Sequence, residues 1–305
     1  VTDNTEPISS AMSPAAPDPY PYPVSFQISL TGFLMLEILL GLSSNLTVLA
    51  LYCMKSNLIS SVSNIVTMNL HVLDVLICVC CIPLTIVVVL LSLERDMALV
   101  CCFHEACVSF ASVATAANVL AITLDRYDIS VKPANRVLTM GRALALLASI
   151  WVLSFASFLV PFIEVGFFAH DHAELNQTVV ENGALSNEYY TEPGLYYHLL
   201  AQIPIFFFTA IVMLITYSKI LQALNIRIGT RFHASQKKKA RRMSLLIVST
   251  FLLCWTPITV LNTVILSVGP SNLMVRLRLG FLVMAYGTTI FHPLLYAFTR
   301  QKFQK

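Results

Sequence analysis

The sequence predicts an all-α membrane protein, a bundle of seven transmembrane helices followed by a short amphipathic eighth helix. Of its 305 residues, 57% are hydrophobic and 11% are charged, whereas soluble globular domains carry roughly 25% charged residues. Seven long apolar stretches each provide the ~20 residues that a helix needs to cross a hydrocarbon core. They run approximately over Val24–Tyr52, Val62–Leu91, Ala106–Leu124, Ala143–Ile163, Tyr196–Tyr217, Met243–Leu266 and Leu279–Phe298.

Basic residues are strongly biased to one side of these seven stretches. Of 19 Lys and Arg residues, all but Arg95, Arg276 and Arg278 fall in the loops after the first, third and fifth spans, in the tail, or at the border of that side. Short cytoplasmic loops collect Lys and Arg. We therefore expect a multi-pass plasma membrane protein with an extracellular N-terminus and a basic inner surface that contacts anionic membrane lipids.

The chain divides into three segments. Residues 1–23 are polar and rich in proline, which predicts a disordered extracellular tail. Residues 24–298 form the seven-helix domain, and residues 299–305 alternate Phe with Lys and Arg, as the start of an interfacial cytoplasmic helix would. In the outer loop after the fourth span, the sequon at Asn176 predicts glycosylation.

Charged and kink-forming residues occur inside the spans, where a charge is costly and therefore indicates function. The second span carries Asp74, and the third ends in an Asp-Arg-Tyr triplet with a proline seven residues after its arginine. The sixth span carries a Phe-x-x-x-Trp-x-Pro pattern, and the seventh carries His-Pro-x-x-Tyr. In chain order these motif residues are Asp125, Arg126, Tyr127, Pro133, Phe251, Trp255, Pro257, His292, Pro293 and Tyr296.

The order of these motifs, each in its own span, resembles the rhodopsin-like (class A) G protein-coupled receptors. The resemblance implies a heterotrimeric G protein as the cytoplasmic partner. In this family Arg126 would meet the G protein once the sixth helix swings outward, and Asp125 would hold the Arg126 guanidinium at rest. The positions implied in coupling and activation are Asp125, Arg126, Tyr127, Pro133, Tyr217 and Tyr296. Phe251, Trp255 and Pro257 would form the toggle, in which the proline kinks the helix.

The resemblance also places a ligand pocket in the outer half of the bundle. Val108 stands where amine receptors have an aspartate, so a protonated amine would lack its counter-ion. Tyr286 stands where opsins have the retinal-binding lysine. The ligand is therefore neither an amine nor retinal, and it stays unknown. The implied lining residues are Glu105, Val108, Tyr197, His198, Gln202, Phe206, Asn262 and Tyr286, in which Glu105 is the one decisive charge.

Three departures from the family pattern lead to separate expectations. Cys101 lies where the family places one half of a disulfide, but the loop 170–192 contains no cysteine. We therefore expect no disulfide between the third span and this loop; the alternative is that Cys101 and Cys102 pair with another chain. No Asp or Glu occurs between Lys219 and Val275, so the acid that often restrains the third-span arginine is missing, and we expect basal signalling, through an inhibitory-type G protein. His292 begins the seventh-span motif in place of Asn or Asp. Asp74, Thr115 and His292 are therefore expected to form a polar switch instead of a sodium site.

Other classes of function fit less well. No nucleophile, phosphate-binding loop or His and Cys cluster indicates an enzyme, a cofactor, a metal site or a nucleic-acid partner. A transporter would usually show inverted repeats and paired broken helices, which the sequence lacks. The better rival is a constitutively active receptor, or a scaffold, that needs no ligand. Measuring G protein activation without added ligand separates the two readings.

Overall fold

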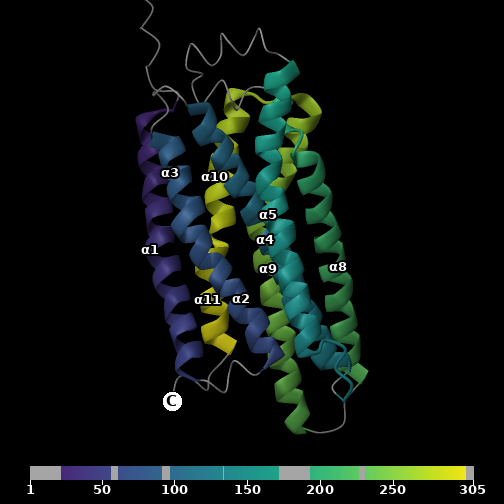
Figure 1. The fold of residues 1–305 in the computed structure, drawn as a ribbon. Helices are drawn as coiled ribbons and strands as arrows, with labels where there is room; N and C mark the ends of the chain where they lie inside the picture. Colours follow the sequence, from purple (N-terminus) through teal and green to yellow (C-terminus); the bar gives the residue numbers. More distant parts are fainter. Residues whose placement is uncertain are drawn as a thin grey trace, which may run out of the picture.

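The seven predicted spans are confirmed by the computed structural model, which describes residues 22–55, 61–90, 97–132, 134–171, 193–226 and 231–299. Within these ranges seven helical segments are long and apolar enough to cross a membrane, and they lie side by side as one bundle (Figure 1). The elements are α1 (Val24–Met54), α2 (Val62–Leu76), the π-helical segment η2 (Ile77–Cys81), α3 (Ile82–Leu90), α4 (Met97–Val131), α5 (Met140–Asp171), the 3₁₀ turn η3 (Pro193–Tyr196), α8 (Leu199–Ile226), α9 (Arg231–Val268), α10 (Asn272–Tyr286) and α11 (Thr288–Thr299).

Most helices extend beyond the apolar stretches that predicted them. The third span continues to Val131 and the sixth begins at Arg231, because a helix keeps its internal backbone hydrogen bonds after it leaves the hydrocarbon region. The second and seventh spans are each built from shorter pieces: η2 joins α2 to α3, and a turn at Gly287 joins α10 to α11. Hydropathy marks where a span lies but not where its helix ends.

α4 is the central helix of the bundle. In its most apolar window 83% of the residues are buried inside the protein, against 22% for α5. Large apolar side chains such as Phe208 and Leu253 are instead exposed on the outside of the bundle. An apolar exterior around a more polar centre is the arrangement that a lipid environment favours.

Buried amides tie neighbouring helices together in the half of the bundle that carries the basic loops. The Asn45 side chain on α1 donates to the Thr289 backbone carbonyl at 2.8 Å, and its Oδ1 lies 2.8 Å from His71 Nδ1 on α2. On the other side of α2, Asn69 donates to Asn118 Oδ1 on α4 at 2.6 Å. Interhelical hydrogen bonds of this kind fix helix positions where burial of apolar surface gives no driving force.

Several predicted features lie outside the described residues. These are the tail 1–21, Pro133, the sequon at Asn176 and residues 300–305, which make up most of the expected eighth helix. Their interpretation stays a prediction.

Candidate functional site

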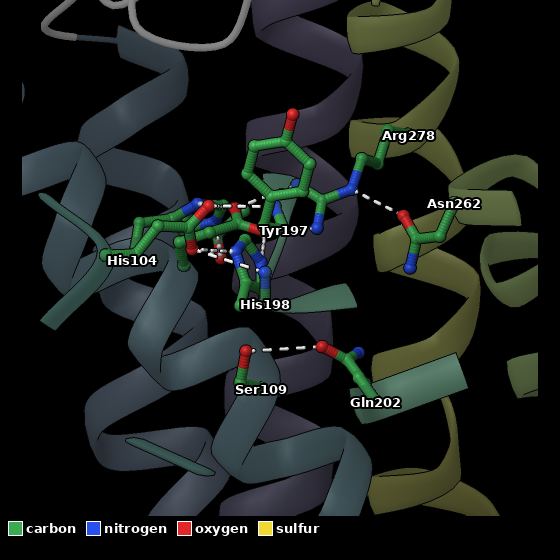
Figure 2. A network of polar contacts seen from close by, with 10 residues as sticks. His104, Ser109, Tyr197, His198, Gln202, Asn262 and Arg278 are labelled. Carbon is green, nitrogen blue, oxygen red and sulfur yellow. Dashed lines mark hydrogen bonds and ion pairs between the residues drawn. The ribbon is translucent and has the colours of Figure 1, made fainter. Parts of the chain in front are cut away.

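Glu105 is the centre of a buried polar cluster at the outer end of the bundle, meaning the end opposite the basic loops. Its carboxylate, on α4, accepts hydrogen bonds from both terminal nitrogens of Arg278 on α10. Nη1 lies 2.8 Å from Oε2, and Nη2 donates to Oε1. Arg278 Nε donates to Asn262 Oδ1 on α9 at 2.8 Å. Glu105 is 1% exposed and Arg278 5%. Two-point pairing of this kind is the strong form of a charge-assisted hydrogen bond. Together with the contact to Asn262, it links α4, α10 and α9 (Figure 2).

His198, at the entrance to α8, connects Glu105 to a second carboxylate. Its Nε2 lies 3.1 Å from Glu105 Oε1 and its Nδ1 lies 2.8 Å from Glu164 Oε2 on α5. Burial disfavours the charged imidazole, but the hydrogen bonds to Glu105 and Glu164 outweigh this cost and hold the pKa of His198 above its ordinary value. The two contacts therefore favour the protonated form of His198.

Glu164 also organises the start of α8. Its Oε1 accepts the Tyr197 backbone N–H at 2.8 Å, and its Oε2 accepts the His198 backbone N–H at 3.3 Å. These donors precede the first residue of α8, where backbone N–H groups lack helical partners and a negative charge is favourable. The α5 carboxylate thus positions the entrance of α8 through backbone and side-chain contacts together.

A small cavity adjoins the cluster. A cavity of about 10 Å³ is lined by His104, Tyr196, Val275, Arg278, Leu279 and Leu282, and that is room for about one water. His104 is held by Thr85 Oγ1 on α3, 3.0 Å from its Nε2. Deeper in the bundle, Ser109 donates to Gln202 Oε1 at 3.2 Å.

The structure brings most of the predicted pocket residues together. Glu105, His198 and Asn262 belong to the cluster, and Gln202 lies one layer below it (Figure 2). Tyr197 differs, because its side chain is 63% exposed and its backbone N–H makes the contact with Glu164.

The predicted toggle residues form an aromatic layer below the cluster. The Phe251 ring centroid lies 5.4 Å from that of Phe206, and Trp255 and Tyr286 meet edge to face at 6.3 Å. All four rings, and Val108, are buried. These contacts link α8 to α9 and α9 to α10, close to Pro257, which lies inside α9.

In the sequence, Arg278 counted only as one of three basic residues on the side opposite the basic loops, and neither it nor Glu164 was given a role. Arg278 lies inside α10, where it is buried against Glu105. The overlooked signal was position: both residues adjoin apolar stretches, where a charge needs a partner. Their pairing was not readable, since Glu105 and Arg278 are 173 residues apart.

Asp74 and His292 meet in the middle of the bundle, as expected for a polar switch. His292 Nδ1 on α11 lies 2.7 Å from Asp74 Oδ2 on α2, and both side chains are buried. Thr115, the third residue assigned to this site, is fully buried on α4. The contact is present, and its effect on sodium stays a prediction.

At the end of the bundle that carries the basic loops, Asp125 pairs with Arg136 from the following loop. Arg136 Nη2 lies 2.5 Å from Asp125 Oδ1, and its Nε lies 3.5 Å from Asp128 Oδ2. Asp128 in turn accepts the backbone N–H groups of Val137 and Leu138 at 3.0 Å each. The loop after α4 therefore folds back on the helix and contacts both Asp125 and Asp128; that Asp125 also holds Arg126 stays a prediction.

Tyr127 and Tyr217, two further positions assigned to activation, lie half-buried on α4 and α8. The side chain of Tyr296 lies outside the described part of the chain, so its approach to Tyr217 stays a prediction.

Comparison with known proteins agrees with this arrangement. A family described as "7 transmembrane receptor (rhodopsin family)" matches residues 44–296. G-protein coupled receptor 22 of Danio rerio is 69% identical over the whole of this chain and 78% of its own length, and that of Rattus norvegicus is 63% identical over the whole chain and 83% of its own. Neuropeptide Y receptor type 6 of Mus musculus is 24% identical over 88% of this chain and 76% of its own.

Proposed function

Because this chain belongs to the rhodopsin family of seven-transmembrane receptors, we propose that it transmits a signal from its outer half to a heterotrimeric G protein at its basic end. It is a receptor and not an enzyme. The observation that carries the proposal is the inner end of α4, where the Asp125-Arg126-Tyr127 triplet lies beside the folded-back loop. The asymmetry of basic residues supports an extracellular N-terminus.

Basal activity is proposed from the sequence, because the acid with which many members of the family restrain the third-span arginine is missing: the segment from Lys219 to Val275, which contains α9, has no acidic residue. Removing a partly exposed restraint of about 1 kcal/mol shifts the active fraction several-fold. The receptor is therefore active without ligand, and the proposed transducer is an inhibitory-type G protein.

The outer cluster favours a second reading, in which the receptor has no conventional small-molecule agonist. The side chains of Glu105, Glu164, His198 and Arg278 contact one another, and the volume of the adjacent cavity is about 10 Å³. Ligand pockets are usually 300–1,000 Å³. In this reading α9 moves spontaneously, and the cluster sets how often it does so.

The test is nucleotide exchange in a defined system. The purified receptor in lipid nanodiscs is mixed with one G protein class at a time, and GTP-analogue uptake is measured with no ligand added. We expect uptake above empty nanodiscs with the inhibitory class, and its loss in Arg126→Ala. Arg142→Ala is the matched control, because Arg142 contacts the Val137 carbonyl on the same side of the membrane and is expected to keep wild-type uptake. Equal uptake by receptor and empty nanodiscs for every class would contradict the proposal.

A further inference from the structure

We propose that the outer cluster binds a proton from the extracellular solution. His198 takes up the proton, and Glu105 and Glu164 accept hydrogen bonds from the protonated ring. This goes beyond the proposed coupling to a G protein. Only its consequence for signalling rests on that function; the proton site itself does not.

The first argument is the hydrogen-bonding capacity of an imidazole. Both ring nitrogens of His198 face carboxylate oxygens, at 3.1 Å from Glu105 and 2.8 Å from Glu164. A neutral imidazole has one N–H and one lone pair, while an ionised carboxylate only accepts. One of the two contacts would then set a lone pair against an oxygen. The imidazolium, with two N–H groups, satisfies both.

The second argument is charge balance in a buried place. The cluster holds two carboxylates, Glu105 and Glu164, and one permanent cation, Arg278. With both carboxylates ionised, its net charge is zero when His198 is protonated and −1 when His198 is neutral. The side chains of Glu105 and His198 are each 1% exposed, and an unbalanced charge at that depth is costly. Glu164, with its side chain 10% exposed, is the route by which a proton from solution reaches the ring.

Charged and polar groups on each neighbouring element act on His198 in a definite direction. From α4, Glu105 favours the proton, and His104 lies 3.9 Å from the same carboxylate. From α10, Arg278 opposes the proton as a like charge, but it is bound to Glu105 and, at 5.5 Å, stands over the Tyr196 ring. Tyr196, on η3, stacks on His198 at 6.4 Å between ring centroids. From α5, Glu164 adds the second favourable carboxylate.

The sign of the effect follows from linkage. The pKa of His198 is raised in the folded protein, because its bonds to the two carboxylates outweigh burial. The stabilisation is therefore complete below the unfolded value of about 6.5 and is lost as pH rises through the higher folded value. Loss of the proton weakens the tie between α5 and the entrance of α8. Since α8 carries Tyr217 near the opposite end, outer pH would alter basal signalling.

The experiment is thermal unfolding of the purified receptor in nanodiscs between pH 5.5 and 9.5, which needs no G protein. The wild-type midpoint is expected to fall by about 5 °C more than that of His198→Gln as pH rises. His104→Gln is the matched control: it removes the neighbouring buried histidine and is expected to keep the wild-type profile. Glu164→Gln removes one of the two carboxylates that favour the protonated ring. In this variant the unfolding midpoint should begin to fall at a lower pH than in the wild type.

A direct readout comes from NMR of isotope-labelled histidine. Wild-type receptor at pH 6.5 should show an imidazolium signal that His198→Gln lacks and His104→Gln retains. The proposal is overturned if His198→Gln keeps the wild-type pH profile, or if that signal reports a neutral ring. If His198→Gln does not fold, an unshifted profile in Glu164→Gln overturns it. A proton site with no nucleotide exchange would refute the coupling proposal alone.

Discussion

His292 and Asp74 touch at 2.7 Å across the centre of the bundle, although they are 218 residues apart in the chain. The contact joins α11, one residue before Pro293, to the C-terminal end of α2. An imidazole nitrogen is a poor ligand for a hard cation, which prefers oxygen. His292 therefore engages the carboxylate of Asp74 that a sodium ion would need as a ligand.

We expect replacement of potassium chloride by sodium chloride to leave the wild-type unfolding midpoint and basal nucleotide exchange unchanged. In His292→Asn, sodium at about ten times its Kd should stabilise the protein by about 1.4 kcal/mol, because the amide oxygen is a suitable ligand. His71→Asn is the control, since His71 contacts Asn45 instead. Strong sodium stabilisation of the wild type would contradict the prediction.

Breaking the Glu105–Arg278 pair should destabilise the receptor in a non-additive way. Arg278→Gln leaves Glu105 buried with less compensation, which costs about 3–5 kcal/mol. The double variant Glu105→Gln with Arg278→Gln should recover much of this loss, because neither charge then remains buried. Thermal unfolding of the wild type, both single variants and the double variant gives the coupling free energy; a loss in the double variant equal to the sum of the two single losses would show that the residues act independently.

Gly41 is expected to tolerate no side chain. A Cβ there would lie 2.8 Å from Cys78 Sγ and 2.9 Å from Thr289 Oγ1, whereas nothing lies within 4 Å of a Cβ at Gly32 on the same helix. Gly41→Ala should therefore cost about 1–3 kcal/mol through overpacking, and Gly32→Ala should cost nothing measurable. A stable Gly41→Ala protein with an unchanged midpoint would show that α1 shifts freely.

Placing Glu at Lys237 should lower basal signalling. Lys237 lies near the start of α9, eighteen residues before Trp255, where many family members have the acid that restrains the third-span arginine. Lys238→Glu makes the same charge change about 100° around the helix and should have a smaller effect. Nucleotide exchange is compared at equal receptor amounts, and an equal or higher rate in Lys237→Glu would be contrary to expectation.

No disulfide should join Cys101 to the outer loop before α8. Cys101 is buried at the outer end of α4, and the loop 172–192 has no cysteine to offer it. Such a staple usually contributes ~2–4 kcal/mol, so reducing agent should leave the unfolding midpoint unchanged. Peptide mapping without reduction checks this: a Cys101 bond to another cysteine of the chain would refute it.

The membrane fold was predictable because its signal is local. A transmembrane span can be recognised from about twenty consecutive, mostly apolar residues. The Asp125-Arg126-Tyr127 triplet and the Trp255–Pro257 segment lie inside such spans. The helix ends were missed, since hydropathy reports contact with lipid and the helix at Arg231 continues beyond it. The Asp74–His292 contact was expected because family resemblance supplied the positions that composition alone does not relate.

What the sequence determined by itself was how many times the chain crosses the membrane and which end carries the basic loops, because lipid solvates each segment according to its own residues. Which charges neutralise one another was decided only by the tertiary structure. The chain order did not reveal that Arg278 would meet Glu105, or that the loop after α4 would fold back and bring Arg136 to Asp125. A buried charge is stabilised by whichever opposite charge the packing brings near it, and that distance in space is not encoded by distance along the chain.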